Sequence, residues 1–239
     1  MSVLVITGTD TGVGKTVVCA AIAAMLREQG HRVAVLKPAQ TGVAPTEEGD
    51  LDVVRRFAGE VTTSELRRYP EPLAPEAAAR RSGLEPLTPG AIAEEAVRLA
   101  ETHDHVLVEG AGGLLVRFGP DGGTLADVAW SLGAPLVIVA RAALGTLNAT
   151  ALTAEVATRR GVDVAGVVIG AWPREPGLAE RCNLVDLPEV AGAPLLGALD
   201  EELSDAQAPE FLAAARRGLS PRFGGEFDAV RFRGDSART

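Results

Sequence analysis

The residues best suited to chemistry lie near the start of the chain, where an apolar run meets a glycine-rich turn. The run from Val3 to Ile6 reads as a strand buried on both faces. The turn from Gly8 to Gly14 follows and leads directly into Lys15 and Thr16. Glycines let backbone N–H groups surround phosphate oxygens, a lysine reaches the β- and γ-phosphates, and a threonine hydroxyl can bind Mg²⁺. The pattern predicts a nucleotide-binding P-loop that opens a helix.

The spacing within this turn is unusual. Five residues separate Gly8 from Gly14, whereas the common P-loop has about four at that point. We expect the longer loop to bring the hydroxyls of Thr9 and Thr11 within reach of the γ-phosphate. A glycine-rich turn that binds nothing is the alternative, and the lysine-threonine pair in register after a buried strand argues against it. The expected nucleotide contacts of the loop are Thr11, Gly12, Val13, Gly14, Lys15, Thr16 and Val17.

A second informative stretch is a buried strand that ends in a carboxylate. Val106 to Val108 lead into Glu109, and a Gly-Ala-Gly-Gly turn follows. In P-loop enzymes an acid at the end of such a strand contacts Mg²⁺, directly or through water. Mg²⁺ prefers oxygen ligands. Glu109 is therefore a candidate metal ligand, and the alternative is that it caps the turn.

Lysine usage singles out one further position. Lys15 and Lys37 are the only lysines among 23 basic residues, so both positions favour a compact ammonium over a guanidinium. We expect a strand to stop at Lys37 and a loop to place Lys37, Gln40 and Thr41 at the carboxyl edge of the sheet, where open α/β sheets bind ligands. Asp50 begins a short amphipathic helix and is either its cap or a metal ligand.

Strands and helices alternate along the chain. This predicts an α/β fold of the P-loop NTPase type, a single doubly wound domain with a mostly parallel central sheet flanked by helices. The domain is expected to span residues 1–220, followed by a tail, 221–239, whose end is expected to be disordered. Gly145 to Asn148 opens a helix whose free N–H groups form a candidate second anion site. A proline-rich segment, 67–83, fits either a surface crossover or part of a substrate pocket.

Composition limits the partners. The chain has 239 residues and a net charge of −9, so we expect neither nucleic acid nor an anionic membrane surface as a partner. No apolar stretch reaches the ~18 residues of a membrane span, and no leader precedes the first strand, so a cytoplasmic protein is expected. Cys19 and Cys182 form no metal or disulfide pattern.

The motifs GTDTGVGKT, KPAQTG and VEGAGG, in this order, closely resemble those of dethiobiotin synthetases. The likeness covers almost the whole chain up to the final helix. Members of this family convert 7,8-diaminopelargonic acid, CO₂ and ATP into dethiobiotin, ADP and phosphate. The resemblance implies that one amine takes up CO₂ as a carbamate. The γ-phosphoryl group then passes to the carbamate, and the second amine closes the ureido ring with loss of phosphate.

The resemblance also implies roles for individual residues. Lys15 would hold the β- and γ-phosphates, and Thr11 would contact the γ-phosphate. Lys37 would bridge the carbamate and the γ-phosphate, with Thr41 beside it. The implied Mg²⁺ ligands are Thr16, Asp50 and Glu109. The implied substrate contacts are Lys37, Thr41, Gly110, Gly145, Thr146, Leu147, Asn148 and Asn183.

In this family the active site lies at a homodimer interface. The resemblance implies that the helix start at Gly145 to Asn148 binds the substrate carboxylate from the neighbouring subunit. Asn183 stands where the family places another cross-interface contact, often a tyrosine. Many members read adenine with an Asn-Asp pair, where this chain has Gly170 and Ala171, then Trp172 and Pro173. We expect backbone groups to read the base, with preference relaxed or shifted from ATP to another nucleotide such as CTP.

A nucleotide-switched ATPase of the ParA/MinD type, acting as a binding module, is the alternative function. Such proteins usually carry an extra lysine early in the P-loop, where this chain has Gly8, Thr9 and Asp10. They also need a membrane- or DNA-binding surface, which the acidic composition disfavours. The synthetase half of a cobyrinate-type amidotransferase would need a glutaminase domain. A GTPase would need an Asn-Lys-x-Asp motif, which the chain lacks.

Overall fold

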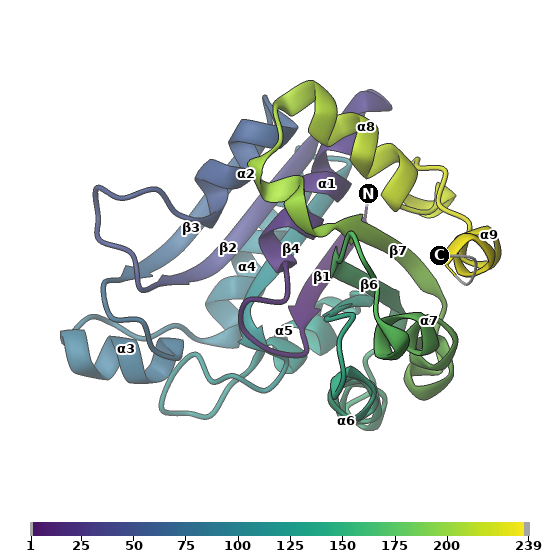
Figure 1. Cartoon of the computed structure of the whole chain (residues 1–239). Helices are drawn as coiled ribbons and strands as arrows, with labels where there is room; N and C mark the ends of the chain where they lie inside the picture. The colour runs from purple at the N-terminus through teal and green to yellow at the C-terminus, as the bar shows by residue number, and fades with distance from the viewer. Residues whose placement is uncertain (1, 237–239) are drawn as a thin grey trace.

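The computed structural model describes residues 2–236, and it builds them into a central sheet with helices on both faces (Figure 1). Each neighbouring pair of strands in the sheet is parallel. In spatial order the strands of this described part are β3 (Thr62–Tyr69), β2 (Val33–Thr41), β4 (His105–Gly113), β1 (Ser2–Gly8), β5 (Leu136–Ala140), β6 (Val164–Trp172) and β7 (Leu195–Asp200). The chain winds to both sides of β1, so the predicted doubly wound α/β fold is confirmed.

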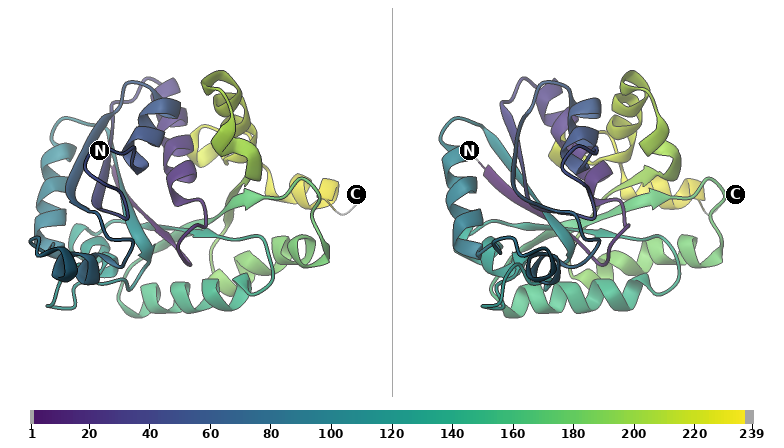
Figure 2. Two further views of the ribbon diagram at one scale, coloured as in Figure 1. Left: turned by 60° about the vertical axis from the view of Figure 1, so that its left-hand side comes forward. Right: turned by 90° about the vertical axis from the view of Figure 1, so that its left-hand side faces the viewer.

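Two helical layers enclose the sheet (Figure 2). One layer contains α1 (Lys15–Glu28), α2 (Asp50–Ala58) and α8 (Ala208–Gly218). The other contains α4 (Pro89–Ala100), α5 (Leu125–Leu132), α6 (Thr146–Arg159) and α7 (Leu178–Ala191), and α3 (Pro75–Ser82) packs into the same core. Successive side chains of β1 point to opposite faces of the sheet, so Val5 lies in one core while Leu4 and Ile6 lie in the other.

The sheet extends further at one edge than the sequence indicated. β2 continues to Thr41 instead of stopping at Lys37, because β3 pairs with it as far as Tyr69. β3 was not predicted from the sequence, because it is mostly polar and only partly buried, as an edge strand can be. In consequence Lys37 lies inside the sheet rather than at a strand end, and only 3% of its surface is exposed.

The expectation of a disordered tail is wrong for residues 221–236. They form a 3₁₀ helix, Pro221–Phe223, and helix α9, Ala229–Ser236. Phe227 is buried in the core, and the rings of Trp172 and Phe232 meet edge to face with centroids 5.3 Å apart. Elements this short give no detectable periodicity, so the aromatic anchors were the only signal in the sequence. Residues 237–239 lie outside the described part of the chain.

A single carboxylate ties the start of β2 to the start of β4. Asp104 Oδ2 accepts a hydrogen bond from the backbone N–H of Arg32 at 2.8 Å, and Oδ1 accepts one from its guanidinium at 2.8 Å. These bonds hold the pKa of Asp104 well below its usual range. The two strands that they join carry Lys37 and Glu109 at their middle positions. Within residues 2–236 no helix has the length and apolar character needed to cross a membrane.

Candidate active site

The strand order brings the predicted motifs to one edge of the sheet. β4 lies between β2 and β1, with Leu36 opposite Val108 and Ile6 opposite Glu109. The residue after Leu36, the residue after Val108 and the P-loop after β1 therefore meet. A cavity of about 790 Å³ opens there, lined by the P-loop, the ends of β2 and β4, and the segment 72–75. The proline-rich segment thus forms part of the cavity wall.

The P-loop adopts backbone conformations that require glycine at two positions. Gly12 and Gly14 have φ angles of 70° and 91°, which favour glycine. The Lys15 side chain is buried, and its ammonium donates to the carbonyl oxygen of Asp10 at 2.8 Å. Burial, and then the nearby charge of Lys37, lower the pKa of Lys15 to about 8. Phosphate oxygens in the loop would favour the ammonium form.

Lys37 is the centre of a buried charged cluster. Its Nζ lies 2.8 Å from Glu109 Oε1 and 2.5 Å from Asp50 Oδ2, and it donates to the carbonyl oxygen of Gly110 at 3.3 Å. Glu109 Oε1 also accepts a hydrogen bond from Thr16 Oγ1 at 2.8 Å. Burial alone would lower the pKa of Lys37, but the two carboxylates raise it above its ordinary value, so the ammonium stays charged. The structure thus brings the three candidate metal ligands together around this one lysine.

The start of α2 shows which residues cap this helix. The N-cap position belongs to Gly49, whose N–H donates to Asp52 Oδ2 at 2.8 Å. Asp50 is the first helical residue, and its carboxylate is turned to Lys37. The cap interpretation of Asp50 is therefore wrong, and Asp52 performs that role. The sequence could not separate the two because the positions are two residues apart on the same turn.

The donor set fits Mg²⁺. Glu109 is fully buried, and its Oε2 has no hydrogen-bond partner among residues 2–236, so the carboxylate retains acceptor capacity where water is excluded. Burial raises the pKa of this carboxyl, and the donors Lys37 and Thr16 oppose the rise. The described residues contain no cluster of three His, Cys, Asp or Glu side chains that could hold a metal. Mg²⁺ commonly takes one or two carboxylates and completes its shell with waters and phosphates.

The residues expected to contact the nucleotide base lie in two separate places. Gly170 packs against the P-loop, because a Cβ at Gly170 would collide with the carbonyl oxygen of Val13 and one at Gly14 would lie 2.7 Å from the Gly170 carbonyl oxygen. Trp172 and Pro173 instead line a second cavity of about 800 Å³, beside the 3₁₀ helix Glu201–Asp205 and α8. The indole of Trp172 is buried against α9.

The second candidate anion site is built around the start of α6. Gly145 caps the helix with a φ of 94°, and Thr146 to Asn148 form its first turn. In the described part of the chain these residues do not line the P-loop cavity. Asn183 is buried on α7, and its Nδ2 donates to the carbonyl oxygens of Ala142 and Ala143 at 2.6 and 3.3 Å. These bonds hold the loop that leads to α6.

Other predicted residues lie around the main cavity, and some contacts were missed. Thr11, Gly12, Val17 and Thr41 line it, whereas Gly110 contributes its carbonyl oxygen to Lys37. Gln40 also lines the cavity, and its Oε1 accepts a hydrogen bond from the backbone N–H of Asp50 at 2.8 Å. The sequence placed Gln40 at this edge without assigning it a contact. Pro72, Leu73, Ala111 and Val116 carry no polar signal that could have identified them as lining residues.

The chain is similar to known proteins over most of its length. A family model described as an AAA domain matches residues 2–208. The ATP-dependent dethiobiotin synthetase BioD of Streptomyces avermitilis is 61% identical over 232 residues, covering 97% of this chain and 98% of the relative. That of Saccharopolyspora erythraea is 62% identical over 227 residues, covering 95% and 99%.

Solved structures show the fold alone. The cell division ATPase MinD of Pyrococcus furiosus matches with a TM-score of 0.57 at 16% identity, over 90% of this chain and 95% of that one. A chain of the MinC:MinD cell division protein complex of Aquifex aeolicus matches with a TM-score of 0.55 at 17% identity, over 100% of this chain and 95% of that one. High identity over nearly the full length, together with the P-loop and the lysine-carboxylate cluster, decides the matter: the chain belongs to the family of ATP-dependent dethiobiotin synthetases.

Proposed function

We propose that this chain is a dethiobiotin synthetase that uses a nucleoside triphosphate to close the ureido ring of dethiobiotin from 7,8-diaminopelargonic acid and CO₂. The observation that carries the proposal is the Lys37 cluster. A buried ammonium, two carboxylates and a hydroxyl meet at the mouth of a P-loop. Such a site holds two anions side by side and offsets the charge that develops between them.

The P-loop side of the cavity would position the nucleotide. Backbone N–H groups of the loop and the ammonium of Lys15 would hold the β- and γ-phosphates, and Thr11 lines the cavity beside them. Thr16, Asp50 and Glu109 would hold Mg²⁺, which when bound neutralises phosphate charge and orients the γ-phosphoryl group. Most of the rate enhancement would come from positioning and charge neutralisation rather than from covalent catalysis.

Lys37 would act between the two substrates. In the structure its ammonium contacts the carboxylate oxygens of Asp50 and Glu109 that would bind Mg²⁺. Binding of a metal-nucleotide complex would therefore release the ammonium to face the cavity. There it would bridge the carbamate oxygen and the γ-phosphate, with Thr41 beside it. Diamine attack on CO₂ forms the carbamate, phosphoryl transfer makes its oxygen a leaving group, and the second amine expels phosphate as the ring closes.

The nucleotide base would occupy the second cavity, next to Trp172 and Pro173. Gly170 and Ala171 supply no side-chain amide or carboxylate there, so backbone groups would read the base. We therefore propose that the preference among ATP, CTP and GTP is weak or is shifted toward CTP. Turnover that falls to background with every nucleotide except ATP would refute this part.

A homodimer would complete the site. Large apolar side chains are exposed on and beside α6 and α7, among them Leu144 at 89%, Leu152 at 56% and Leu178 at 74%. A second copy that covers this face would bring the α6 N-terminus of one subunit toward the cavity of the other. The first turn of α6, Thr146 to Asn148, would then bind the substrate carboxylate through backbone N–H groups.

The direct test of the function is phosphate release from the purified protein with Mg²⁺, bicarbonate and 7,8-diaminopelargonic acid, with ATP, CTP and GTP in parallel. Each component is omitted in turn. We expect release to require both the diamine and bicarbonate. Release that is indifferent to both, and is raised by a protein partner, would favour the ParA/MinD-type alternative.

A further inference from the structure

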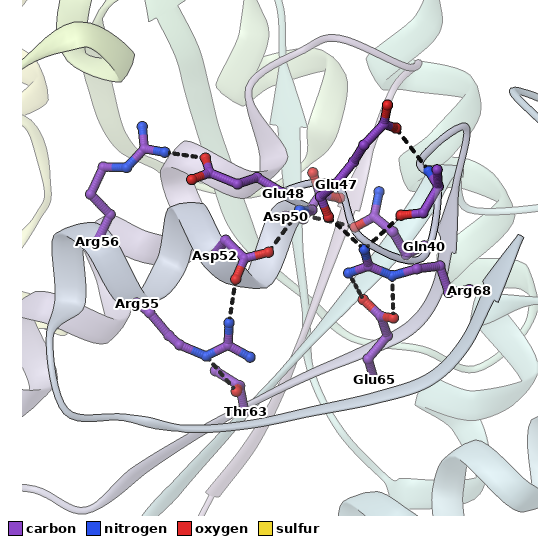
Figure 3. A network of polar contacts seen from close by, with 12 residues as sticks. Gln40, Glu47, Glu48, Asp50, Asp52, Arg55, Arg56, Thr63, Glu65 and Arg68 are labelled. Atoms are coloured by element: carbon purple, nitrogen blue, oxygen red, sulfur yellow. Dashed lines mark hydrogen bonds and ion pairs between the residues drawn. The ribbon is translucent and has the colours of Figure 1, made fainter. Parts of the chain in front are cut away.

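The loop between β2 and α2 leads to Asp50, and an arginine on β3, Arg68, forms hydrogen bonds to the backbone of this loop. Figure 3 shows the guanidinium of Arg68 between the carboxylate of Glu65 and the backbone of this loop. Arg68 Nη1 donates to the carbonyl oxygens of Glu47 and Ala44 at 2.7 and 3.2 Å. Its Nε and Nη2 donate to the two carboxylate oxygens of Glu65 at 2.7 and 2.9 Å. One side chain thus joins the loop to the edge strand.

Further contacts connect the guanidinium of Arg68 with the backbone at Gly49 and Asp50. A Cβ at Gly49 would lie 2.8 Å from Arg68 Nη2 and 2.9 Å from Gln40 Oε1, so the loop backbone packs directly on both side chains. Gln40 Oε1 accepts the N–H of Asp50 at 2.8 Å. The backbone on both sides of the Gly49–Asp50 peptide is therefore fixed by side chains from β2 and β3, the neighbours in the sheet.

Apart from Arg68, the side-chain ties of residues 44–48 are weak by comparison. The pair Arg56–Glu48 joins side chains that are 51% and 73% exposed, and exposed pairs of this kind contribute little. Glu47 Oε2 accepts a hydrogen bond from the N–H of Ala44, and this bond lies within the loop and does not join the loop to another element. Arg68 and Glu65 are only about one-fifth exposed and are joined by two parallel bonds, the arrangement in which arginine is most specific.

We propose that Arg68 is a positioning residue for the reaction: held by Glu65, it fixes the 44–49 loop and thereby sets the carboxylate of Asp50 at the place where it binds the cation of the site. Arg68 does not line the P-loop cavity. A lysine cannot replace it, because one ammonium cannot span two carboxylate oxygens and two carbonyl oxygens at once. The inference rests on the proposed role of Asp50 as a metal ligand.

The test measures Mn²⁺ binding in place of Mg²⁺, by electron paramagnetic resonance, with a non-hydrolysable ATP analogue present. Arg68→Gln is expected to weaken Mn²⁺ binding roughly tenfold, as loss of a residue that orients a metal ligand typically does. The matched control is Arg67→Gln. Arg67 is the next residue on the same strand but pairs with Glu85, so Mn²⁺ binding should stay at the wild-type value. Melting temperatures report whether each variant folds.

The double variant shows whether Arg68 acts through Asp50. Asp50→Asn should itself weaken Mn²⁺ binding, and adding Arg68→Gln to it should cause no further loss. Losses that multiply, or an Arg68→Gln protein that binds Mn²⁺ like the wild type, would overturn the positioning role. If Asp50→Asn leaves Mn²⁺ binding unchanged, the ligand role of Asp50 fails, and the inference fails with it. If Arg68→Gln does not fold, Arg68→Lys replaces it, with a loss of several-fold expected and unchanged binding overturning the proposal.

Discussion

Replacing Lys37 by methionine would test the charged cluster most sharply. Methionine has a similar length and no charge, so Lys37→Met leaves Asp50 and Glu109 facing each other. Their oxygens lie 2.5 and 2.8 Å from the same nitrogen. They are thus at most about 5 Å apart, and at an effective dielectric constant of about 20 their repulsion is about 3 kcal/mol.

The predicted effect on stability follows from that figure. A loss of about 3 kcal/mol in a chain of this size corresponds to a fall in melting temperature of about 6–12 °C. The same substitution frees both carboxylates for a cation. If the variant then binds Mg²⁺ with a dissociation constant of about 1 mM, about 10 mM Mg²⁺ returns about 1.4 kcal/mol of stability by mass action.

The assay is differential scanning fluorimetry without nucleotide, with and without Mg²⁺, on the wild type and on Lys37→Met. We expect Mg²⁺ to raise the melting temperature of the variant and barely to change that of the wild type, in which the Lys37 ammonium already pairs with both carboxylates. Ring formation by the variant should be lost. Equal responses of the two proteins to Mg²⁺ would show that Lys37 and the cation do not share these oxygens.

Other predictions concern the metal, the pH dependence of stability and the α6 region. Glu109→Gln should raise the Mg²⁺ concentration for half-maximal phosphate release roughly tenfold; an unchanged titration would show that Glu109 is not a ligand. Asp104→Asn should lower the melting temperature by a constant amount above about pH 5 and by less as the pH falls. The reason is that a carboxyl whose pKa is lowered on folding stabilises only while it is ionised; a difference that grows on acidification would contradict this. Asn183→Ala should cost about 1–3 kcal/mol and raise the KM for the diamine, because two loop carbonyls lose their donor. Leu152→Glu should convert the proposed dimer to monomers in light scattering and lower activity, and an intact dimer would remove this face from the interface.

The sequence predicted the parts of the site that follow apolar strands. The P-loop, Lys37 and Glu109 each come at or near the end of such a run, and parallel strands must bring those ends to one edge. Asp50 stayed ambiguous because an acid at a helix start suits both a cap and a ligand. Only the structure shows that Asp52 takes the cap.

The missed features lack a period that sequence patterns can detect. β3 alternates weakly because it is a partly buried edge strand, and no sequence pattern gave Arg68 a role. The segment 221–236 is held by Phe227 and Phe232 rather than by a long helix. Asn183 was singled out as a substrate contact by resemblance alone, and nothing in the sequence indicated that its amide donates to two carbonyl oxygens of a distant loop. The conformation of β3, the packing of residues 221–236 and the hydrogen bonds of Asn183 all depend on contacts between segments that are distant in the chain.

The measurement that tests the central claim most directly follows the carbon of CO₂ into product. The purified protein is given Mg²⁺, ATP, 7,8-diaminopelargonic acid and ¹³C-bicarbonate, and dethiobiotin is analysed by mass spectrometry while phosphate is counted. We expect ¹³C in the ureido carbonyl and one phosphate released for each ring closed. Lys37→Arg should lose the labelled product, because a guanidinium cannot take the place of a compact ammonium between two anions. Phosphate release without labelled dethiobiotin, or full labelling by Lys37→Arg, would contradict it.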